Sequence, residues 1–165
     1  MLIPAFRENK IGTELLVLDT LSPAARSRNM SRIKGRDTSP ELAVRRLLHA
    51  LGYRYRLHLK NLPGKPDIAF PGRRKAVLVH GCFWHRHSGC RFAYEPKSRK
   101  EFWKSKFESN VLRDRAVMDA LAEKGWEALV IWECQLKDLS LLEGRLKSFL
   151  GAPKARRDYC DLLHV

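Results

Sequence analysis

The stretch Lys75-Ala-Val-Leu-Val-His-Gly-Cys-Phe-Trp-His-Arg-His-Ser-Gly-Cys90 organises the chain. Its first part is an apolar run of β-forming residues, which predicts a short buried strand ending near His80. The run breaks at Gly81, and residues 80 to 90 then hold three histidines, two cysteines and two large aromatic residues. Such a composition does not form a core, so we expect a functional site in this loop.

Cysteine and histidine spacing in the loop predicts a metal site. Cys82, His87 and Cys90 supply three ligands, and Cys134, at the end of another apolar run, is available as a fourth. A Cys3His set is a common closed tetrahedral zinc site, which holds structure and does no chemistry itself. The alternatives are buried cysteines that act as small hydrophobes, or a disulfide, which is less favoured because nothing marks the chain as secreted.

Charge points to nucleic acid. The chain has 165 residues and a net charge of +14, from 32 basic and 18 acidic residues. The usual counter-charge for such an excess is phosphate.

The length of the chain predicts one domain, over residues 21–150. Residues 1–20 before it are a disordered arm or an extension, and residues 151–165 form a tail. No apolar stretch could cross a membrane and no signal peptide is recognisable, so we expect a cytoplasmic protein.

The periodicity predicts an α/β fold, with a mixed sheet and helices on its faces. The expected elements are a basic helix from Ser22 to about Gly35, a helix after Thr38 that ends at Gly52, strands at 53–58, 67–70 and 75–80, a helix at 100–124, a strand at 126–132 and a helix at 140–150.

An acid and two histidines suggest phosphodiester hydrolysis. Asp67, at the head of one predicted strand, lies beside the end of its hairpin partner at His80. A carboxylate there can hold Mg2+, which offsets phosphoryl charge and activates water. The partner strand carries neither an acid nor a lysine at its end, so the second protein ligand would be a carbonyl, that of Val79. The base would be His85 or His80.

Three aromatic residues suit DNA distortion. Phe83 and Trp84 could be pushed between base steps, and Trp103 could join them from the long helix; such wedges favour weakly paired sites such as mismatches. The alternative for each is core packing, which is most serious for Trp103. Glu41 has an ordinary alternative role too, because an acid in the first turn complements the helix dipole.

Seven motifs in order resemble the very short patch repair endonucleases. They are Arg26-Ser-Arg-Asn-Met30, Arg36-Asp-Thr38 with Glu41, Leu62-Pro-Gly-Lys-Pro-Asp67, His80-Gly-Cys-Phe-Trp-His-Arg-His87, Glu101-Phe-Trp103, Asn110-Val-Leu-Arg-Asp114 and Trp132-Glu-Cys134. The resemblance covers roughly residues 20 to 140. It implies a restriction-endonuclease-like fold with a structural zinc. It also implies Mg2+-dependent nicking 5′ to the T of a T:G mismatch, which arises when 5-methylcytosine deaminates.

The resemblance also implies roles for single residues. Asp67 would bind Mg2+ together with the main-chain carbonyl of Val79, His85 would be the general base, and His80 and Glu41 would complete the active site through water and phosphate contacts.

The binding residues follow from the same resemblance. Phe83, Trp84 and Trp103 would intercalate, Cys82, His87, Cys90 and Cys134 would bind zinc, and the basic helix with Arg26, Arg28 and Arg32 would embrace the DNA from its minor-groove side.

Two departures from the family pattern stand out. Val79 replaces a threonine that is common in the family, and Ser88-Gly89 lengthens the spacing between His87 and Cys90 by one residue. Two other functions are compatible with the sequence: a restriction-like nuclease of the same fold with another DNA target, and a non-catalytic zinc-stabilised DNA-binding module. The module would not need Asp67 and His85. We expect a monomer, because one nick needs one active site.

Overall fold

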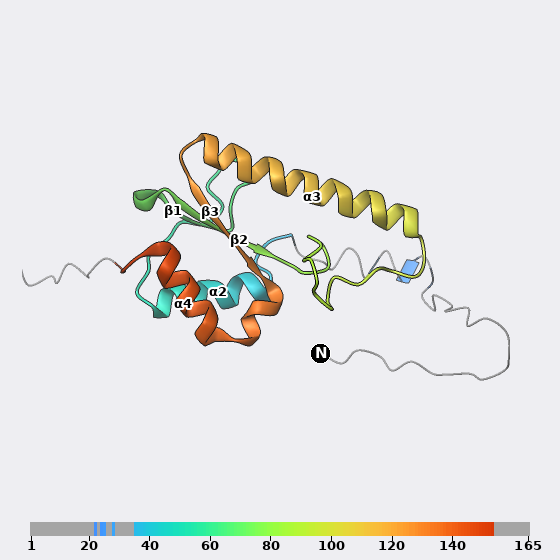
Figure 1. Ribbon diagram of the computed structural model, residues 1–165, viewed down its shortest axis with the longest axis horizontal. Coiled ribbons are helices and arrows are strands. Elements are labelled where there is room, and N and C mark those ends of the chain that lie inside the picture. The colour runs from blue at the N-terminus through green and yellow to red at the C-terminus, as the bar shows by residue number, and fades with distance from the viewer. Residues whose placement is uncertain (1–21, 23, 26–27, 29–34, 154–165) are drawn as a thin grey trace, which may run out of the picture.

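The computed structural model describes residues 35–153 together with positions 22, 24, 25 and 28. Within this part, a small sheet lies between a long helix on one side and two short helices on the other (Figure 1). The predicted α/β class with a mixed sheet is therefore confirmed. The predicted extension at 1–20 lies outside the described residues, as do Arg26 and Arg32, and the domain boundaries stay a prediction.

The sheet has three strands, β1 (Ile68–Phe70), β2 (Lys75–His80) and β3 (Glu127–Trp132), in that order. β1 runs antiparallel to β2, and β3 runs parallel to β2. A parallel pair needs a long crossover between its strands, and α3 (Lys100–Glu123) lies in that crossover. The register sets His80 directly beside Trp132 at the ends of the two parallel strands.

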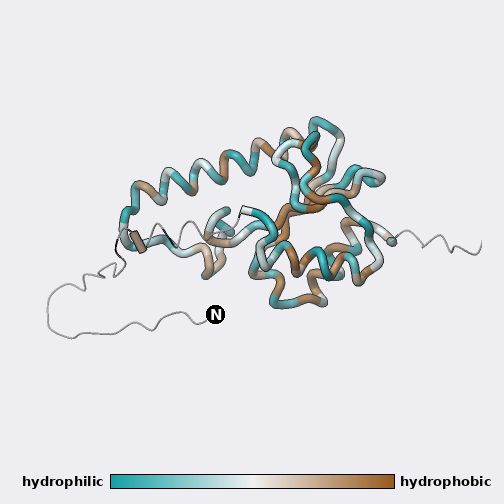
Figure 2. The backbone as a smooth tube through the Cα atoms, turned by 180° about the vertical axis from the view of Figure 1, so that it is seen from behind, coloured by the Kyte–Doolittle hydropathy of each residue, from teal (hydrophilic) through white to brown (hydrophobic). Residues whose placement is uncertain are grey.

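Alternate side chains of β2 enter two separate cores. Val77 packs with α2 (Ser39–Ala50) and α4 (Leu139–Leu150), where Val44, Leu48, Leu142 and Leu146 are buried. Ala76 and Leu78 face the other way and pack with Leu121 of α3. Figure 2 shows the resulting pattern, with hydrophobic strands between helices that are polar over much of their length. Each core buries one face of the sheet, so the end of β2 is held from both sides.

Only the C-terminal part of α3 covers the sheet. Its N-terminal half extends beyond it (Figure 1), and the ring of Phe107 there contacts Phe83 from the loop that follows β2, at 5.1 Å between ring centroids. The long helix therefore joins the sheet to the loop at 81–90.

The predicted strand at 53–58 is wrong. Arg56 forms a single bridge with Ala69, through two main-chain hydrogen bonds of 2.8 Å. The backbone before it still closes α2, because Tyr53 N–H donates to Leu48 O, and His58 has a positive φ of 46° that bends the chain away. The segment with alternating side chains therefore pairs with β1 through Arg56 alone.

The connection between β1 and β2 also differs from a simple hairpin turn. It contains a short 3-10 helix, η1 (Pro71–Arg73), followed by Arg74 in the left-handed region. Among the described residues, no helix is both long and apolar enough to span a membrane.

Candidate active site and metal centre

Asp67 lies immediately before β1 and is oriented by the neighbouring strand. Val79 N–H donates a hydrogen bond of 2.8 Å to its Oδ2. Burial raises the pKa of Asp67, and the nearby carboxylate of Glu41 raises it further, while the bond from Val79 acts in the opposite direction. A bound divalent cation would offset the negative charge of Asp67 that burial disfavours, so this carboxylate can serve as a metal ligand.

Glu41 is buried in a cap at the start of α2. Its N–H donates to Thr38 Oγ1 at 3.4 Å, the Thr38 hydroxyl donates to Glu41 Oε1 at 2.9 Å, and Asp37 N–H donates to Glu41 Oε2 at 3.0 Å. The side chain is 4 % exposed. The cap therefore fixes this carboxylate near enough to Asp67 to raise the pKa of Asp67, which is more than a helix-dipole role requires.

Arg45, one turn further along α2, joins this cap. Its Nη2 donates to Glu41 Oε2 at 2.9 Å and lies 3.2 Å from His58 Nε2, and its Nη1 donates to Asp37 Oδ1 at 2.5 Å. Asp37, Glu41 and His58 are close enough together to hold a metal. However, the guanidinium already provides the positive charge there. The sequence reasoning missed Arg45 and His58, although the i,i+4 spacing of Glu41 and Arg45 is a signal for their pairing.

His80 and His85 lie one over the other at the end of β2. Their rings are 3.9 Å apart and nearly parallel, at 14°. Burial, and then the neighbouring His85, lower the pKa of His80 to about 4, so His80 is neutral near pH 7. Two candidates for the base are thus in contact, and they differ in exposure: His80 is buried and His85 is partly exposed.

Asp114 of α3 holds His85. His85 Nδ1 is 2.5 Å from Asp114 Oδ2. A ring that donates its Nδ1–H to a carboxylate keeps Nε2 free to accept a proton. Asp114 belongs to one of the seven motifs, but its role cannot be predicted from the sequence, because only the packing of α3 against the loop places it beside His85.

The acid and the histidines meet at one strand end. Asp67 is bonded to the backbone of Val79, and the next residue, His80, carries the stacked pair. Glu41 of α2 acts electrostatically on Asp67, and Asp114 of α3 is bonded to His85, so helices on both sides of the sheet contribute to the groups at this strand end.

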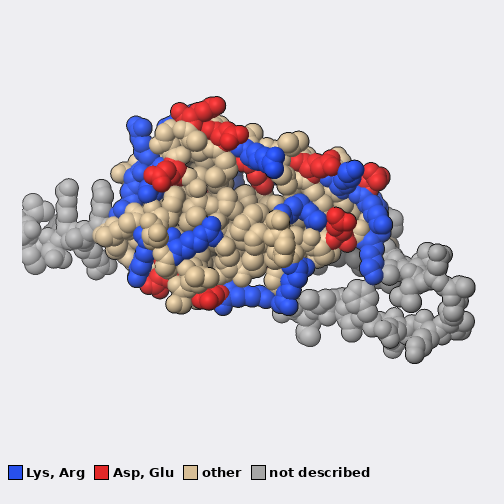
Figure 3. All heavy atoms as spheres, viewed as in Figure 1, with Lys and Arg blue, Asp and Glu red and all other residues tan. Residues whose placement is uncertain are grey.

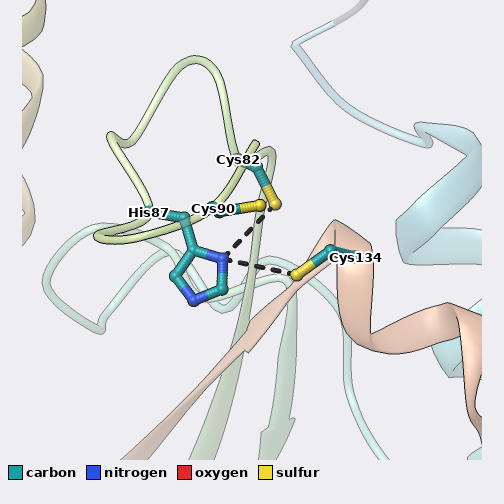
Figure 4. Close-up of side chains that lie close together, drawn as sticks. All are labelled: Cys82, His87, Cys90 and Cys134. Carbon is teal, nitrogen blue, oxygen red and sulfur yellow. Dashed lines mark hydrogen bonds between the residues drawn. The ribbon is translucent and has the colours of Figure 1, made fainter. Parts of the chain in front are cut away.

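The four predicted zinc ligands lie together (Figure 4). Their ligand atoms are all within 4.8 Å of one another, and His87 Nδ1 lies 3.6 Å from Cys82 Sγ and 3.3 Å from Cys134 Sγ. Cys90 reaches the group because Gly89 adopts a positive φ of 69°, which turns the lengthened loop back. The extra residue in the spacing is thereby accommodated.

The chemistry of this group fits a soft cation. The three cysteines are free thiols, and burial raises the pKa of the Cys82 thiol to about 12. A metal ion would stabilise the thiolates that burial alone disfavours. Three sulfurs and one imidazole nitrogen are the donors of a closed zinc site.

The three aromatic candidates form one cluster. The ring centroids of Phe83 and Trp84 are 5.1 Å apart, those of Phe83 and Trp103 5.4 Å, and those of Trp84 and Trp103 5.9 Å. All three side chains are partly exposed. Trp103 also lines an open groove of about 710 Å³ along α3. It is therefore not a core residue of the sheet, and the cluster is available to a ligand.

Basic side chains are spread widely over the surface. On the face in Figure 3, lysines and arginines lie over several elements, and acidic side chains are interspersed among them along α3. Arg86 covers the ring of Phe107 at 4.5 Å, next to the aromatic cluster. Basic side chains spread over several elements can contact successive phosphates of an extended polyanion.

Comparison with known proteins gives consistent matches. Residues 18–91 match a family model described as DNA mismatch endonuclease Vsr. The chain is 52% identical over 132 residues to the type II nicking enzyme V.XorIIP of Xanthomonas oryzae pv. oryzae, which covers 80% of this chain and 96% of that protein. It is 41% identical over 119 residues to the DNA mismatch endonuclease Vsr of Escherichia coli strain K12, covering 72% of this chain and 76% of that one.

Proposed function

Because the chain belongs to the Vsr family and is a DNA endonuclease, we propose that it nicks one strand of duplex DNA 5′ to the T of a T:G mismatch, with Mg2+ as cofactor. The observation that carries this proposal is the convergence of Asp67, Glu41 and the Asp114–His85–His80 group at one end of β2. The fold is then of the restriction-endonuclease-like kind, with its active site at the β1–β2 pair.

Asp67 and the carbonyl of Val79 would hold the metal ion. When bound, Mg2+ offsets charge on the phosphoryl oxygens and favours ionisation of a bound water. Val79 N–H orients the carboxylate from one side, and Glu41, fixed by the cap of α2, is the nearby acid that water can bridge to the site. Only main-chain atoms of Val79 are used, so the absence of a threonine hydroxyl is compatible with activity.

His85 is the general base. Its Nδ1 is bonded to Asp114, which leaves Nε2 to take a proton from the attacking water, and Asp114 then stabilises the charged ring. His80 is buried beneath it and neutral, so it does not compete for the proton. It keeps the His85 ring in place and can donate a hydrogen bond to phosphate.

The aromatic cluster selects the substrate. Phe83, Trp84 and Trp103 are close enough to act as one wedge, and inserting a wedge costs least where base pairing is already weak. The cluster of Cys82, His87, Cys90 and Cys134, called the thiol–imidazole group below, holds zinc. It thereby keeps the loop that carries Phe83 and Trp84 in position. The enzyme acts as a monomer, because a single-strand nick needs one active site.

A second candidate is a nicking enzyme with another DNA target. The relatives from Xanthomonas oryzae and from Neisseria meningitidis serogroup A, the latter 38% identical over 128 residues, are named type II nicking enzymes rather than mismatch endonucleases. The chemistry at β2 would be unchanged, and only the requirement for a mismatch would differ.

One experiment separates these functions. End-labelled duplexes that differ only at one pair, T:G or C:G, are incubated with the protein and Mg2+ at fixed salt. We expect a single nick 5′ to the T in the mismatched duplex alone. Equal cutting of both duplexes would favour the second candidate, and binding without cutting would contradict both.

The variant Asp67→Asn tests the site in the same assay. We expect nicking to be lost and DNA binding to be retained. The midpoint of thermal unfolding should not fall: since the folded state raises the pKa of Asp67, ionised Asp67 destabilises the fold above that pKa, and asparagine removes this charge. Nicking by a folded Asp67→Asn protein at the wild-type rate would exclude Asp67 as the metal ligand.

A further inference from the structure

Trp132 lies between the metal centre and the histidine pair. Its indole ring is stacked on the ring of His87, at 4.2 Å between centroids and 6° between planes. The same indole meets the ring of His80 edge-on, at 5.4 Å and 77°. One side chain therefore contacts a member of the thiol–imidazole group and a member of the active site.

Strand pairing and hydrogen bonds fix the backbone of Trp132. Trp132 is the last residue of β3 and is paired in register with His80 of β2. Its N–H donates to Gln135 Oε1 at 3.0 Å, and Arg145 of α4 donates to the same oxygen at 2.8 Å. Cys134, two residues further on, belongs to the thiol–imidazole group. A movement of the Cys134 end of the strand would thus be felt at Trp132.

We propose that Trp132 is a positioning residue that makes the placement of His80, and through it of His85, depend on metal binding by the group Cys82, His87, Cys90 and Cys134. His87 Nδ1 faces the sulfurs of Cys82 and Cys134, so a metal ion held by this group would fix the plane of the His87 ring. The flat face of Trp132 follows the plane of His87, and its edge sets the position of His80.

Further contacts connect His80 to the proposed base, His85. His80 is stacked on His85 at 3.9 Å, and His85 is bonded to Asp114. His85 thus contacts Asp114 through Nδ1 and His80 through the face of its ring, so both neighbours position it. The inference rests on the proposed roles of His85 and of the metal, and it assigns the metal centre an effect on the rate of nicking as well as on stability.

Another tryptophan provides a matched comparison. Trp126 lies just before β3, at the opposite end of the same strand, and packs in the core beside α3. Its role is to fill space, and replacing it should affect stability alone. If Trp132 were also only a space-filling residue, substitutions at the two positions would have the same kind of effect.

The test compares two substitutions at each position. Trp132→Phe keeps a flat ring, whereas Trp132→Met keeps apolar bulk without one; Trp126→Phe and Trp126→Met are the controls. Each protein is loaded with Zn2+, and four quantities are measured: zinc content, affinity for the mismatched duplex, the single-turnover nicking rate, and the ring 15N NMR signals of the histidines.

We expect Trp132→Met to nick about 10–100-fold more slowly, in line with the cost of a misplaced catalytic group, with zinc content and DNA affinity retained. The ring signals of His80 and His85 should shift. Trp132→Phe should remain near wild type in both rate and ring signals, and neither Trp126 variant should change them.

The proposal is wrong if Trp132→Met nicks no more slowly than Trp126→Met, or if its His80 and His85 signals match those of the wild type. If Trp132→Met does not fold, the test is made on the wild-type protein with and without Zn2+. The conditions are chosen so that circular dichroism shows the metal-free form to be folded. Adding Zn2+ must then move the His80 and His85 signals, and a change confined to His87 would overturn the proposal. The NMR readout does not require nicking, so it remains informative even if the proposed substrate is wrong.

Discussion

At the scale of single residues, the contact between His85 and Asp114 determines how the proposed base works. The imidazole accepts a proton on Nε2 only while Nδ1 carries the other hydrogen, and the Asp114 carboxylate favours that arrangement. It also stabilises the positive ring once the proton has been taken. An asparagine at position 114 would have nearly the same shape, but its neutral amide would not stabilise the positive ring and could face His85 with its NH2 group.

We expect Asp114→Asn to lower the nicking rate by roughly 10²-fold, the lower end of what general-base catalysis contributes. Binding of the mismatched duplex should be unchanged. The measurement is single-turnover nicking at saturating protein, with binding followed separately in Ca2+.

Asp119→Asn is the matched control, because Asp119 is exposed on the same helix. It should nick at the wild-type rate. An Asp114→Asn protein as active as this control would remove Asp114 from the mechanism.

Sequence reasoning found this site only in part, for a physical reason. Asp67, His80 and His85 could be predicted because they lie at the ends of strands or next to a glycine break, where local pattern carries the signal. Asp114 and His58 could not, because each acts through a side-chain contact between segments far apart in sequence, whereas Arg45 was missed although its i,i+4 spacing from Glu41 indicates their pairing. That Arg56 alone pairs with the sheet also could not be predicted, because the alternation of side chains over residues 53–58 does not show that the chain bends away at His58.

At the scale of elements, the start of α2 combines stability with site geometry. Thr38 and Glu41 cap the helix, and Arg45 neutralises Glu41 from one turn further along. Both members of this ion pair are buried, with 8% and 5% of their side chains exposed. Removing the arginine would leave a buried carboxylate without its charged partner, close to Asp67.

We expect Arg45→Met to lower the free energy of unfolding by about 3–5 kcal/mol, the usual cost of breaking a buried ion pair. Methionine keeps the helix propensity and much of the apolar stem, so the loss reports the charge. The measurement is urea-induced unfolding followed by circular dichroism.

Arg46→Met controls for the general loss of positive charge, because Arg46 is the exposed neighbour on the same helix. Its stability should stay close to that of the wild type. Equal losses for the two variants would mean that the buried pair with Glu41 contributes nothing specific.

At the scale of the whole molecule, the proposed metal centre joins parts of the chain that are far apart in sequence. Three of its members come from the loop after β2, and Cys134 comes from η2 (Glu133–Lys137), which follows β3. The proposed zinc would therefore tie the loop with Phe83 and Trp84 to the end of the parallel strand pair. Hydrophobic packing alone does not hold this loop, because most of its side chains are only partly buried.

We expect Cys134→Ala to lose zinc and stability together: less than one equivalent of zinc at stoichiometric supply, and a midpoint of unfolding lower by roughly 10 °C. Metal analysis and a thermal scan measure the two quantities. Ser88→Ala, an exposed substitution in the same loop, should change neither. A Cys134→Ala protein with a full equivalent of zinc and an unchanged midpoint would contradict the assignment.

The architecture was more predictable than the site. Each helix and strand of the sheet carries its own periodic signal, and the parallel pairing of β2 with β3 follows once a long helix separates two apolar strands. The division of α3 into a half that covers the sheet and a half that extends to the loop has no such local signal. It depends on how far the helix continues past the edge of the sheet.

The distance in sequence between Cys90 and Cys134 also has a consequence for biosynthesis. Chains leave the ribosome from the N-terminus, and domains fold as their parts emerge. Asp67 and its partner Val79 are made early, but Asp114, which is bonded to His85, and Cys134, which lies with the loop residues Cys82, His87 and Cys90, are made later. A nascent chain that ends before α3 would contain His85 without Asp114, so the proposed base would be held in place only after most of the domain has been made.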